Sequence, residues 1–230
     1  YQVTEDHDFL YFNGAELFVE IARFWASIAS YDRADDRYDI CGVMGPDEFH
    51  DGYPDRDTPG LDNNAYTNGM AAWCIARALD LLELLPKERC RELCRTLRIE
   101  QEELAHWEHV SRKLYLPFHD DGILSQFEGY AVLQEFDWDA YRRKYPNIMR
   151  LDLILETEND TPNRYKLSKQ ADVLMLFYLF SAEELAEIFA RLGYTFDPGT
   201  IPRTIDYYLR RSSHGSTLSA IAHAWVLARS

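Results

Sequence analysis

The amino-acid sequence predicts an all-α protein, folded as a toroid or as a repeat of helical hairpins. Apolar residues recur at helical spacing along most of the 230 residues. Strand signals are short and few, and no sequence repeat at a fixed period is present, which disfavours a consensus solenoid. Two segments rich in glycine, proline or hydroxyl residues interrupt the helices, and such segments in compact domains usually carry the functional site.

Four helices are expected in the first half of the chain, at residues 10–30, 64–85, 86–98 and 101–114. An apolar stripe at three- and four-residue spacing, including Phe18 and Ile21, runs along the first of them. Pro86 separates the second helix from the third, because proline ends one helix and is well tolerated in the first turn of the next. Short strands are expected at 38–43 and 120–126.

Six further helices are expected, at residues 137–144, 146–155, 165–180, 181–192, 202–209 and 216–228. Ser181 followed by Glu184 matches the capping box of a helix N-terminus. Gly193 stands where a helix C-cap is expected.

The composition supports one packed core and excludes several classes of protein. With 47% apolar residues, the chain suffices for one core and shows no sign of a second domain. The longest apolar run, 173–180, is far shorter than the ~18 residues of a membrane span. The net charge of −15 makes nucleic acid a poor partner, because phosphate neutralisation requires a basic surface. The sequence begins YQVTEDHDFL, without an initiating methionine, which suggests a piece of a longer polypeptide.

Four cysteines are present, Cys41, Cys74, Cys90 and Cys94, of which the last two share a helical face. A metal site would usually add a second close pair or nearby histidines, which the sequence lacks. We therefore expect reduced, structural thiols in a cytoplasmic protein, with no metal and no organic cofactor.

The first irregular segment, 42–63, contains the sequence Gly-Pro-Asp-Glu ending at Glu48. Glycine and proline make this backbone rigid and allow close approach. If the aromatic residues Phe49, Tyr53 and Tyr66 surround Glu48, desolvation favours its neutral form, as a general acid requires. The alternative interpretation is an acidic, solvated loop shaped by turn residues.

The second irregular segment, 210–219, gathers hydroxyl and imidazole donors behind Arg210 and Arg211. These donors are Ser212, Ser213, His214, Ser216, Thr217 and Ser219. Gly215 allows the backbone close to a ligand, and the following helix directs its N-terminal N–H groups at the segment. This combination favours an anion, and phosphate in particular. Ordinary loop polarity with an N-cap serine is the alternative.

Two further groups of residues are candidates for sugar binding. Lys169 and Gln170 open an apolar helix, where their side chains could bind sugar hydroxyls or form a solvated polar cap. Glu128, with Phe127 and Tyr130 nearby, could line a sugar subsite, since sugars stack on aromatic faces. Such aromatic residues are otherwise part of a core.

Four motifs follow one another along the chain: GPDEFH at 45–50, NNAYTNGMA at 63–71, KQADVL at 169–174 and HGSTLS at 214–219. In this order and spacing the sequence resembles glycoside hydrolase family 65, the family of the maltose, trehalose and kojibiose phosphorylases. Each motif alone is moderately specific, and together they extend along nearly the whole chain. The sequence departs from the family pattern at Phe49, where tyrosine is more frequent, and in the loop 51–61.

The resemblance implies an (α/α)6 barrel, of which residues 1–230 form a partial barrel. This catalytic domain would be the later two-thirds of the barrel, without the N-terminal β-sandwich and the first helices of the family. The resemblance also implies Glu48 as the general acid, and Lys169 with Gln170 as ligands of the glucosyl unit at subsite −1. The phosphate loop of the family is matched by His214, Gly215, Ser216 and Thr217.

The reaction that the resemblance implies is inverting phosphorolysis of an α-linked glucosyl disaccharide. Inorganic phosphate attacks the anomeric carbon while Glu48 protonates the glycosidic oxygen, which yields β-glucose 1-phosphate and a sugar or sugar phosphate. An inverting hydrolase needs a second carboxylate as base, and residues 212–219 contain none. That hydrolase and a non-catalytic carbohydrate-binding fragment are the alternatives. A homodimer is one assembly to expect, and neither nucleic acid nor a membrane is expected as a partner.

Overall fold

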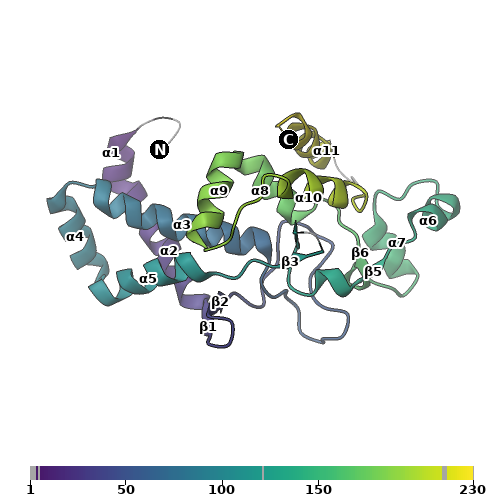
Figure 1. Ribbon diagram of the computed structural model, residues 1–230, viewed down its shortest axis with the longest axis horizontal. Helices are drawn as coiled ribbons and strands as arrows, with labels where there is room; N and C mark the ends of the chain where they lie inside the picture. The colour runs from purple at the N-terminus through teal and green to yellow at the C-terminus, as the bar shows by residue number, and fades with distance from the viewer. Residues whose placement is uncertain (1–3, 5, 121, 214–216, 230) are drawn as a thin grey trace.

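The computed structural model describes residues 4, 6–120, 122–213 and 217–229. Within these residues the chain is an elongated array made mostly of helices (Figure 1). The α-helices are α1 (His7–Phe9), α2 (Ala15–Ile28), α3 (Ala65–Leu84), α4 (Lys87–Leu97), α5 (Gln101–Lys113), α6 (Trp138–Lys144), α7 (Leu151–Thr157), α8 (Asp172–Leu179), α9 (Ala182–Arg191), α10 (Thr200–Leu209) and α11 (Thr217–Arg229). A π-helical turn, Leu10–Gly14, joins α1 to α2, and two 3-10 turns cover Tyr130–Val132 and Pro162–Arg164.

Short two-stranded ladders accompany the helices in the described part of the chain. Two are antiparallel and the third is parallel: β1 (Ser30–Asp32) with β2 (Arg37–Asp39), β3 (Phe118–His119) with β4 (Ile123–Leu124), and β5 (Gln134–Glu135) with β6 (Tyr165–Lys166). The strands predicted at 38–43 and 120–126 overlap β2 and β4, and both are shorter than expected. The prediction of an all-α fold class is therefore confirmed.

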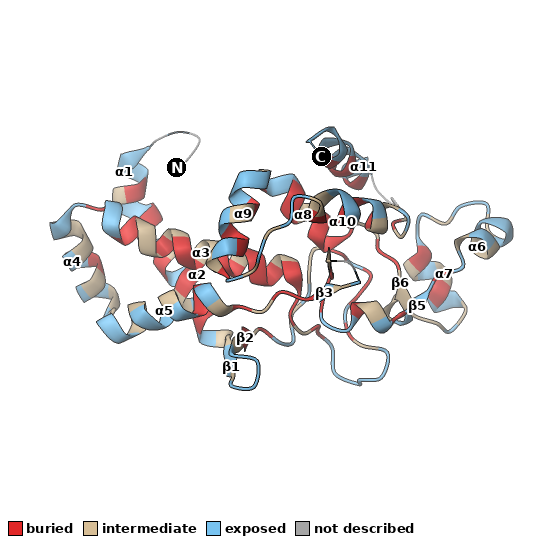
Figure 2. Ribbon diagram, viewed as in Figure 1, coloured by how far each residue is buried: buried red, intermediate tan, exposed pale blue. Residues whose placement is uncertain are grey.

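Helix α3 is the centre of the packing, since it contacts α2 and α5 as well as α8 and α9. Its buried face is rich in small residues, among them Ala71, Ala72 and Ala78. Small side chains allow two helix axes to approach closely, so the neighbouring helices pack tightly on this face. Figure 2 shows buried residues along α2, α3 and α8, and the core continues from α8 to α10 and α11.

The helix boundaries follow local capping chemistry. Asn64 caps α3 through its Oδ1, which accepts a hydrogen bond of 3.0 Å from the backbone N–H of Thr67. The predicted capping box of α9 is confirmed, because the side chains of Ser181 and Glu184 each accept a hydrogen bond from the other's backbone. Gly193 follows with φ +77°, the left-handed conformation that favours glycine after a helix.

The predicted helix 165–180 is wrong in its first part, since α8 begins only at Asp172. The residues before it are mostly extended and include β6. The Ser168 N–H donates to the Arg211 carbonyl at 2.8 Å, and the Ser213 N–H donates to the Ser168 carbonyl at 2.9 Å. These tertiary hydrogen bonds outweigh the local helical preference of the segment.

A second, smaller core joins α6 and α7 to the rest of the chain. Its buried members are Phe49, Phe136, Leu151, Leu155 and Leu167. Helix α7 begins at Leu151, later than the predicted start at Pro146. The reason is a local turn in which the Asn147 side chain accepts the Met149 N–H at 2.8 Å, a bond that competes with helix formation.

All four cysteines carry free thiols. Burial raises the pKa of the Cys74 thiol to about 11, so this thiol is neutral at physiological pH. The described residues contain no group of three histidine, cysteine or acidic side chains that could hold a metal ion. No helix in the described ranges combines the length and apolarity needed to cross a bilayer.

Glu158 ties α6 to the end of α7. Its carboxylate accepts hydrogen bonds from Lys144, from Tyr145 and, at 2.8 Å, from the Tyr141 hydroxyl. Lys144 and the two hydroxyls lower the pKa of Glu158 from its ordinary 4.5 to about 2. Because the folded state has the lower pKa, the stabilisation is present above pH 4.5 and is lost as the pH falls through about 2.

The Glu158→Gln variant should therefore loosen the contact between α6 and α7 at neutral pH and match the wild type near pH 2. Amide hydrogen exchange in α6 measures this, with an expected acceleration at pH 7 below about tenfold, since exposed ion pairs are weak. Glu156→Gln is the matched control, because Glu156 is exposed on the same helix and forms no ion pair in the described part of the chain. Unchanged exchange in Glu158→Gln at pH 7 would refute the role.

Candidate active site

Glu48 lies within the irregular segment 42–63, beside the segment that precedes α8. Its carboxylate forms an ion pair with Lys169 Nζ, and its side chain is 70% exposed. Gln170 donates from Nε2 to the Pro46 carbonyl at 3.3 Å. The structure thus brings the predicted acid together with both predicted ligands of the glucosyl unit, although these lie more than a hundred positions away in the sequence.

Asp47, the neighbour of Glu48, is buried, with a side chain that is 1% exposed. Its Oδ1 accepts the Lys169 backbone N–H at 3.0 Å, and its Oδ2 accepts Gln126 Nε2 at 2.9 Å. The Asp47 N–H in turn donates to the carboxylate of Asp172, the first residue of α8.

Asp172 is also buried and completes the inner part of the site. Its Oδ2 accepts Asn64 Nδ2 at 2.6 Å, and its N–H donates to Gln126 Oε1 at 3.3 Å. Burial raises the pKa of Asp172 well above its ordinary value, and the neighbouring Asp47 carboxylate raises it further. Two carboxyl groups therefore lie together beneath the exposed Glu48.

His50 contacts Asp47 from another side. Its Nε2 lies 3.0 Å from the Tyr165 carbonyl, which can only accept a hydrogen bond, so this nitrogen carries a proton. Its Nδ1 lies 3.5 Å from Asp47 Oδ2, and the ring packs edge-on against Phe127. His50 therefore borders the buried Asp47 carboxylate and packs against the core residue Phe127.

The predicted phosphate loop lies largely outside the described residues, which omit His214, Gly215 and Ser216. Thr217, the fourth predicted member, is exposed and is the first residue of α11. Since α11 has 13 residues, its N-terminus directs a full helix dipole toward the predicted loop.

Both described flanks of that loop are attached to the segment that carries Lys169. On one flank, the Ser213 N–H donates to the Ser168 carbonyl at 2.9 Å. On the other flank, Ser219 Oγ donates to the Lys169 carbonyl at 3.2 Å. Because Lys169 also binds Glu48, the predicted acid, sugar ligands and flanks of the phosphate loop converge on one segment of backbone.

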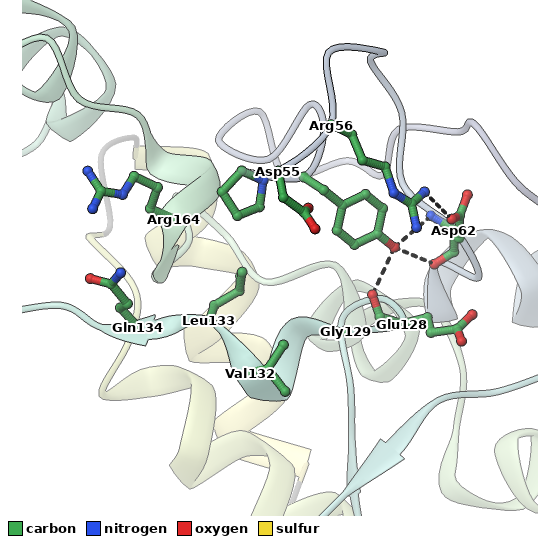
Figure 3. A pocket seen from close by; sticks show the side chains of 11 residues that line it. Asp55, Arg56, Asp62, Glu128, Gly129, Val132, Leu133, Gln134 and Arg164 are labelled. Carbon is green, nitrogen blue, oxygen red and sulfur yellow. Dashed lines mark hydrogen bonds and ion pairs between the residues drawn. The ribbon is translucent and has the colours of Figure 1, made fainter.

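Glu128 borders a separate pocket of about 540 Å³, which we call the Glu128 pocket (Figure 3). Asn63 Nδ2 donates to Glu128 Oε2 at 2.8 Å, and the Tyr53 hydroxyl donates to the Glu128 carbonyl at 2.8 Å. Among the described residues, no hydrogen bond or ion pair joins Glu128 to Glu48 or Lys169. A role of Glu128 in sugar binding stays a prediction.

The expected aromatic surroundings of Glu48 are not formed in the described part of the chain. Phe49 is buried in the smaller core, and Tyr53 lines the Glu128 pocket. Tyr66 lies on α3 and packs against the main core. Glu48 itself faces solvent, so these three rings do not supply the desolvation expected for the acid.

Sequence reasoning missed the buried residues of the site and one exposed arginine. Asn64 belongs to the motif at 63–71 and Asp172 to the motif at 169–174. Both are polar residues beside apolar helices, and this position could have indicated a buried hydrogen bond. Gln126 carried no such signal. Arg150 lies within electrostatic range of Glu48, since the Asp152 carboxylate and, less strongly, Glu48 raise the pKa of Arg150.

Comparison with known proteins is consistent with this geometry. The family model described as the glycosyl hydrolase family 65 central catalytic domain matches residues 1–230. An uncharacterized glycosyl hydrolase of Mycobacterium tuberculosis is 58% identical over 229 residues, which are 100% of this chain and 17% of that protein. The trehalose 6-phosphate phosphorylase of Lactococcus lactis is 37% identical over 95% of this chain. The kojibiose phosphorylase of Halothermothrix orenii is 33% identical over 97% of it.

The chain spans 27% and 26% of the lengths of these two phosphorylases. Its fold is similar to a solved structure provisionally described as a kojibiose phosphorylase from the human microbiome, with a TM-score of 0.76 at 24% identity. The likeness covers 97% of this chain and 28% of that one. The helices accordingly form a partial α/α barrel, as predicted.

Proposed function

Because this chain belongs to glycosyl hydrolase family 65, we propose that it carries the acid and sugar-binding groups for inverting phosphorolysis of an α-glucosidic disaccharide. The observation that carries the proposal is the convergence of Glu48, Lys169 and both flanks of the 214–216 segment on one stretch of backbone. The names of the Lactococcus lactis and Halothermothrix orenii relatives, both phosphorylases of glucosyl disaccharides, support it.

Glu48 is the general acid of the proposed reaction. It protonates the glycosidic oxygen as the bond from that oxygen to the anomeric carbon breaks. Its carboxylate is exposed, so a substrate can reach it. Lys169 Nζ has three N–H donors and can therefore bind Glu48 and a sugar hydroxyl at the same time, with Gln170 beside it as a second ligand.

Inorganic phosphate is the nucleophile and forms the new bond to the anomeric carbon from the face opposite the leaving oxygen. His214, Ser216 and the N-terminus of α11 are its proposed ligands, because N–H and O–H donors at a helix N-terminus favour an anion. Hydrogen phosphate needs no activating base, and residues 212–219 contain no carboxylate that could activate water. The products are β-glucose 1-phosphate and a free sugar or sugar phosphate.

Titration of phosphate tests this proposal. In the full-length polypeptide that carries this sequence, cleavage of trehalose, trehalose 6-phosphate, kojibiose or maltose should require phosphate and should release β-glucose 1-phosphate. His214→Ala should raise the Michaelis constant for phosphate by about tenfold or more, since a charge-assisted hydrogen bond contributes about 1.5–3 kcal/mol. The Michaelis constant for the sugar should change much less. Cleavage that is independent of phosphate would identify a hydrolase, and no cleavage under any condition would identify a binding fragment.

A further inference from the structure

The backbone around Glu48 is held in place by its buried neighbours. The Asp47 N–H donates to Asp172, and the Asp47 carboxylate accepts the Lys169 N–H at 3.0 Å. These hydrogen bonds connect Asp47, the residue before Glu48, to the backbone of Lys169 and to the start of α8. Glu48 itself is 70% exposed and has one hydrogen-bonded partner in the described part of the chain, Lys169.

Gln126 contacts the Asp47 carboxylate and the Asp172 backbone with one side chain. Its Nε2 donates to Asp47 at 2.9 Å, and its Oε1 accepts the Asp172 N–H at 3.3 Å. An amide has a donor end and an acceptor end, so this arrangement is satisfied in only one orientation. Gln126 therefore sets the spacing between the segment of Asp47 and the start of α8.

Asn64 connects the same pair to α3. It donates to Asp172 at 2.6 Å with Nδ2, while its Oδ1 caps α3 by accepting the Thr67 N–H at 3.0 Å. The N-terminus of the central helix α3 thus sets the position of Asp172, and Asp172 sets the position of Asp47. This network runs from the main core to the residue next to Glu48.

We propose that Asp47 and Asp172 are positioning residues, which hold the Glu48 carboxylate in place against Lys169. This inference rests on the proposed function and extends it from the groups that touch substrate to the groups that hold them. Four N–H donors from the described residues satisfy the two carboxyl groups, namely Lys169 N, Gln126 Nε2, Asp47 N and Asn64 Nδ2. Burying two carboxyl groups is unfavourable without such donors, so the arrangement is specific to this geometry.

The Asp172→Asn variant tests the proposal in the full-length polypeptide. The new amide must direct its N–H₂ group at either the Asp47 N–H or Asn64 Nδ2, so a donor faces a donor and the segment shifts. A misplacement of about 1 Å lowers turnover by about 10²-fold, and we expect this loss of kcat for a disaccharide. Phosphorolysis of α-glucosyl fluoride should fall by less than about tenfold, because fluoride leaves with little help from an acid.

The difference between the losses on the disaccharide and on the fluoride distinguishes a positioning role from damage to the fold. A smaller fraction of folded enzyme would lower both rates by the same factor, whereas a displaced Glu48 lowers mainly the rate that needs a proton. The double variant Asn64→Asp with Asp172→Asn should restore most of the disaccharide rate, because donor and acceptor are exchanged and the net charge is unchanged. The introduced carboxylate also caps α3 as well as asparagine does.

Asn64→Ser is the milder second variant, in case Asp172→Asn does not fold. Serine keeps the cap of α3 but cannot reach Asp172, and the same selective loss on disaccharides is expected. Equal losses on both substrates, or no rescue by the double variant, would overturn the proposal. Crystal structures test the proposal independently of activity. A shift of Glu48 away from Lys169 by about 1 Å in the Asp172→Asn variant would support the proposal, and an unmoved Glu48 would refute it. A wild type without phosphate-dependent cleavage would instead refute the proposed function.

Discussion

The Glu48→Gln variant should lose disaccharide phosphorolysis by about 10²–10⁴-fold, the usual contribution of a positioned general acid. Glutamine has nearly the same shape, and its Oε1 can still accept the hydrogen bond from Lys169 Nζ. It has no proton to give to the glycosidic oxygen. The loss should therefore fall on kcat, while the Michaelis constants for sugar and phosphate change little.

A change of leaving group identifies the origin of that loss. With α-glucosyl fluoride the Glu48→Gln variant should recover much of the wild-type rate, because the fluoride ion departs without full protonation. Asp57→Asn is the matched control, since Asp57 is an exposed carboxylate of the same irregular segment. Activity of Glu48→Gln equal to that of the control on both substrates would remove Glu48 from the mechanism.

Helices with strong local signals were predictable from the sequence. α3 and α9 begin and end within two residues of the predicted bounds, because Asn64 and Ser181 are N-caps and Gly193 follows α9. The boundaries of these two helices depend on hydrogen bonds between residues a few positions apart. The residue types that form such bonds can be recognised in the sequence. The fold class follows from these periodic segments alone.

The secondary structure of the segment 165–171 could not be predicted from local sequence patterns. Its apolar continuation into α8 predicts one long helix, yet Ser168 pairs with Arg211 and Ser213, far along the chain. No local sequence pattern indicates that Arg211 and Ser213 are the partners of Ser168. The same pairing carries Lys169 to Glu48, so the error in secondary structure and the assembly of the site have one cause.

The motifs of the candidate site could be predicted from the sequence, but the burial of its individual side chains could not. The sequence identifies Glu48, Lys169 and Gln170, which the structure brings together. It gives no indication that Asp47 is buried while Glu48 is exposed, because adjacent side chains of an irregular segment can face either way. Burial depends on Gln126 and Asp172, which lie far from Asp47 in the sequence.

Gly45 shows how tightly this buried part is packed. A Cβ at this position would overlap Asp172 Oδ2 and would lie 2.5 Å from Asp172 Cγ and 2.6 Å from Asn64 Nδ2. Asp172 cannot move aside without cost, because it is buried and its carboxylate accepts hydrogen bonds from Asn64 and Asp47. The absence of a side chain at Gly45 is therefore a condition for the pairing of Asp47 with Asp172.

The Gly45→Ala variant should accordingly destabilise the fold by about 2 kcal/mol or more, because displacing Asp172 leaves a buried carboxyl group and its N–H donors without their hydrogen bonds. It should also reduce turnover of disaccharides, since displacing Asp172 shifts the backbone beside Glu48. Urea denaturation and steady-state rates measure the two effects. Gly52→Ala is the matched control from the same segment, where the nearest atom to the new Cβ, the Thr58 carbonyl oxygen, lies at an ordinary contact distance of 3.6 Å. If both variants unfold at the same urea concentration and turn over at the same rate, the close approach of Gly45 to Asp172 has no part in holding the site.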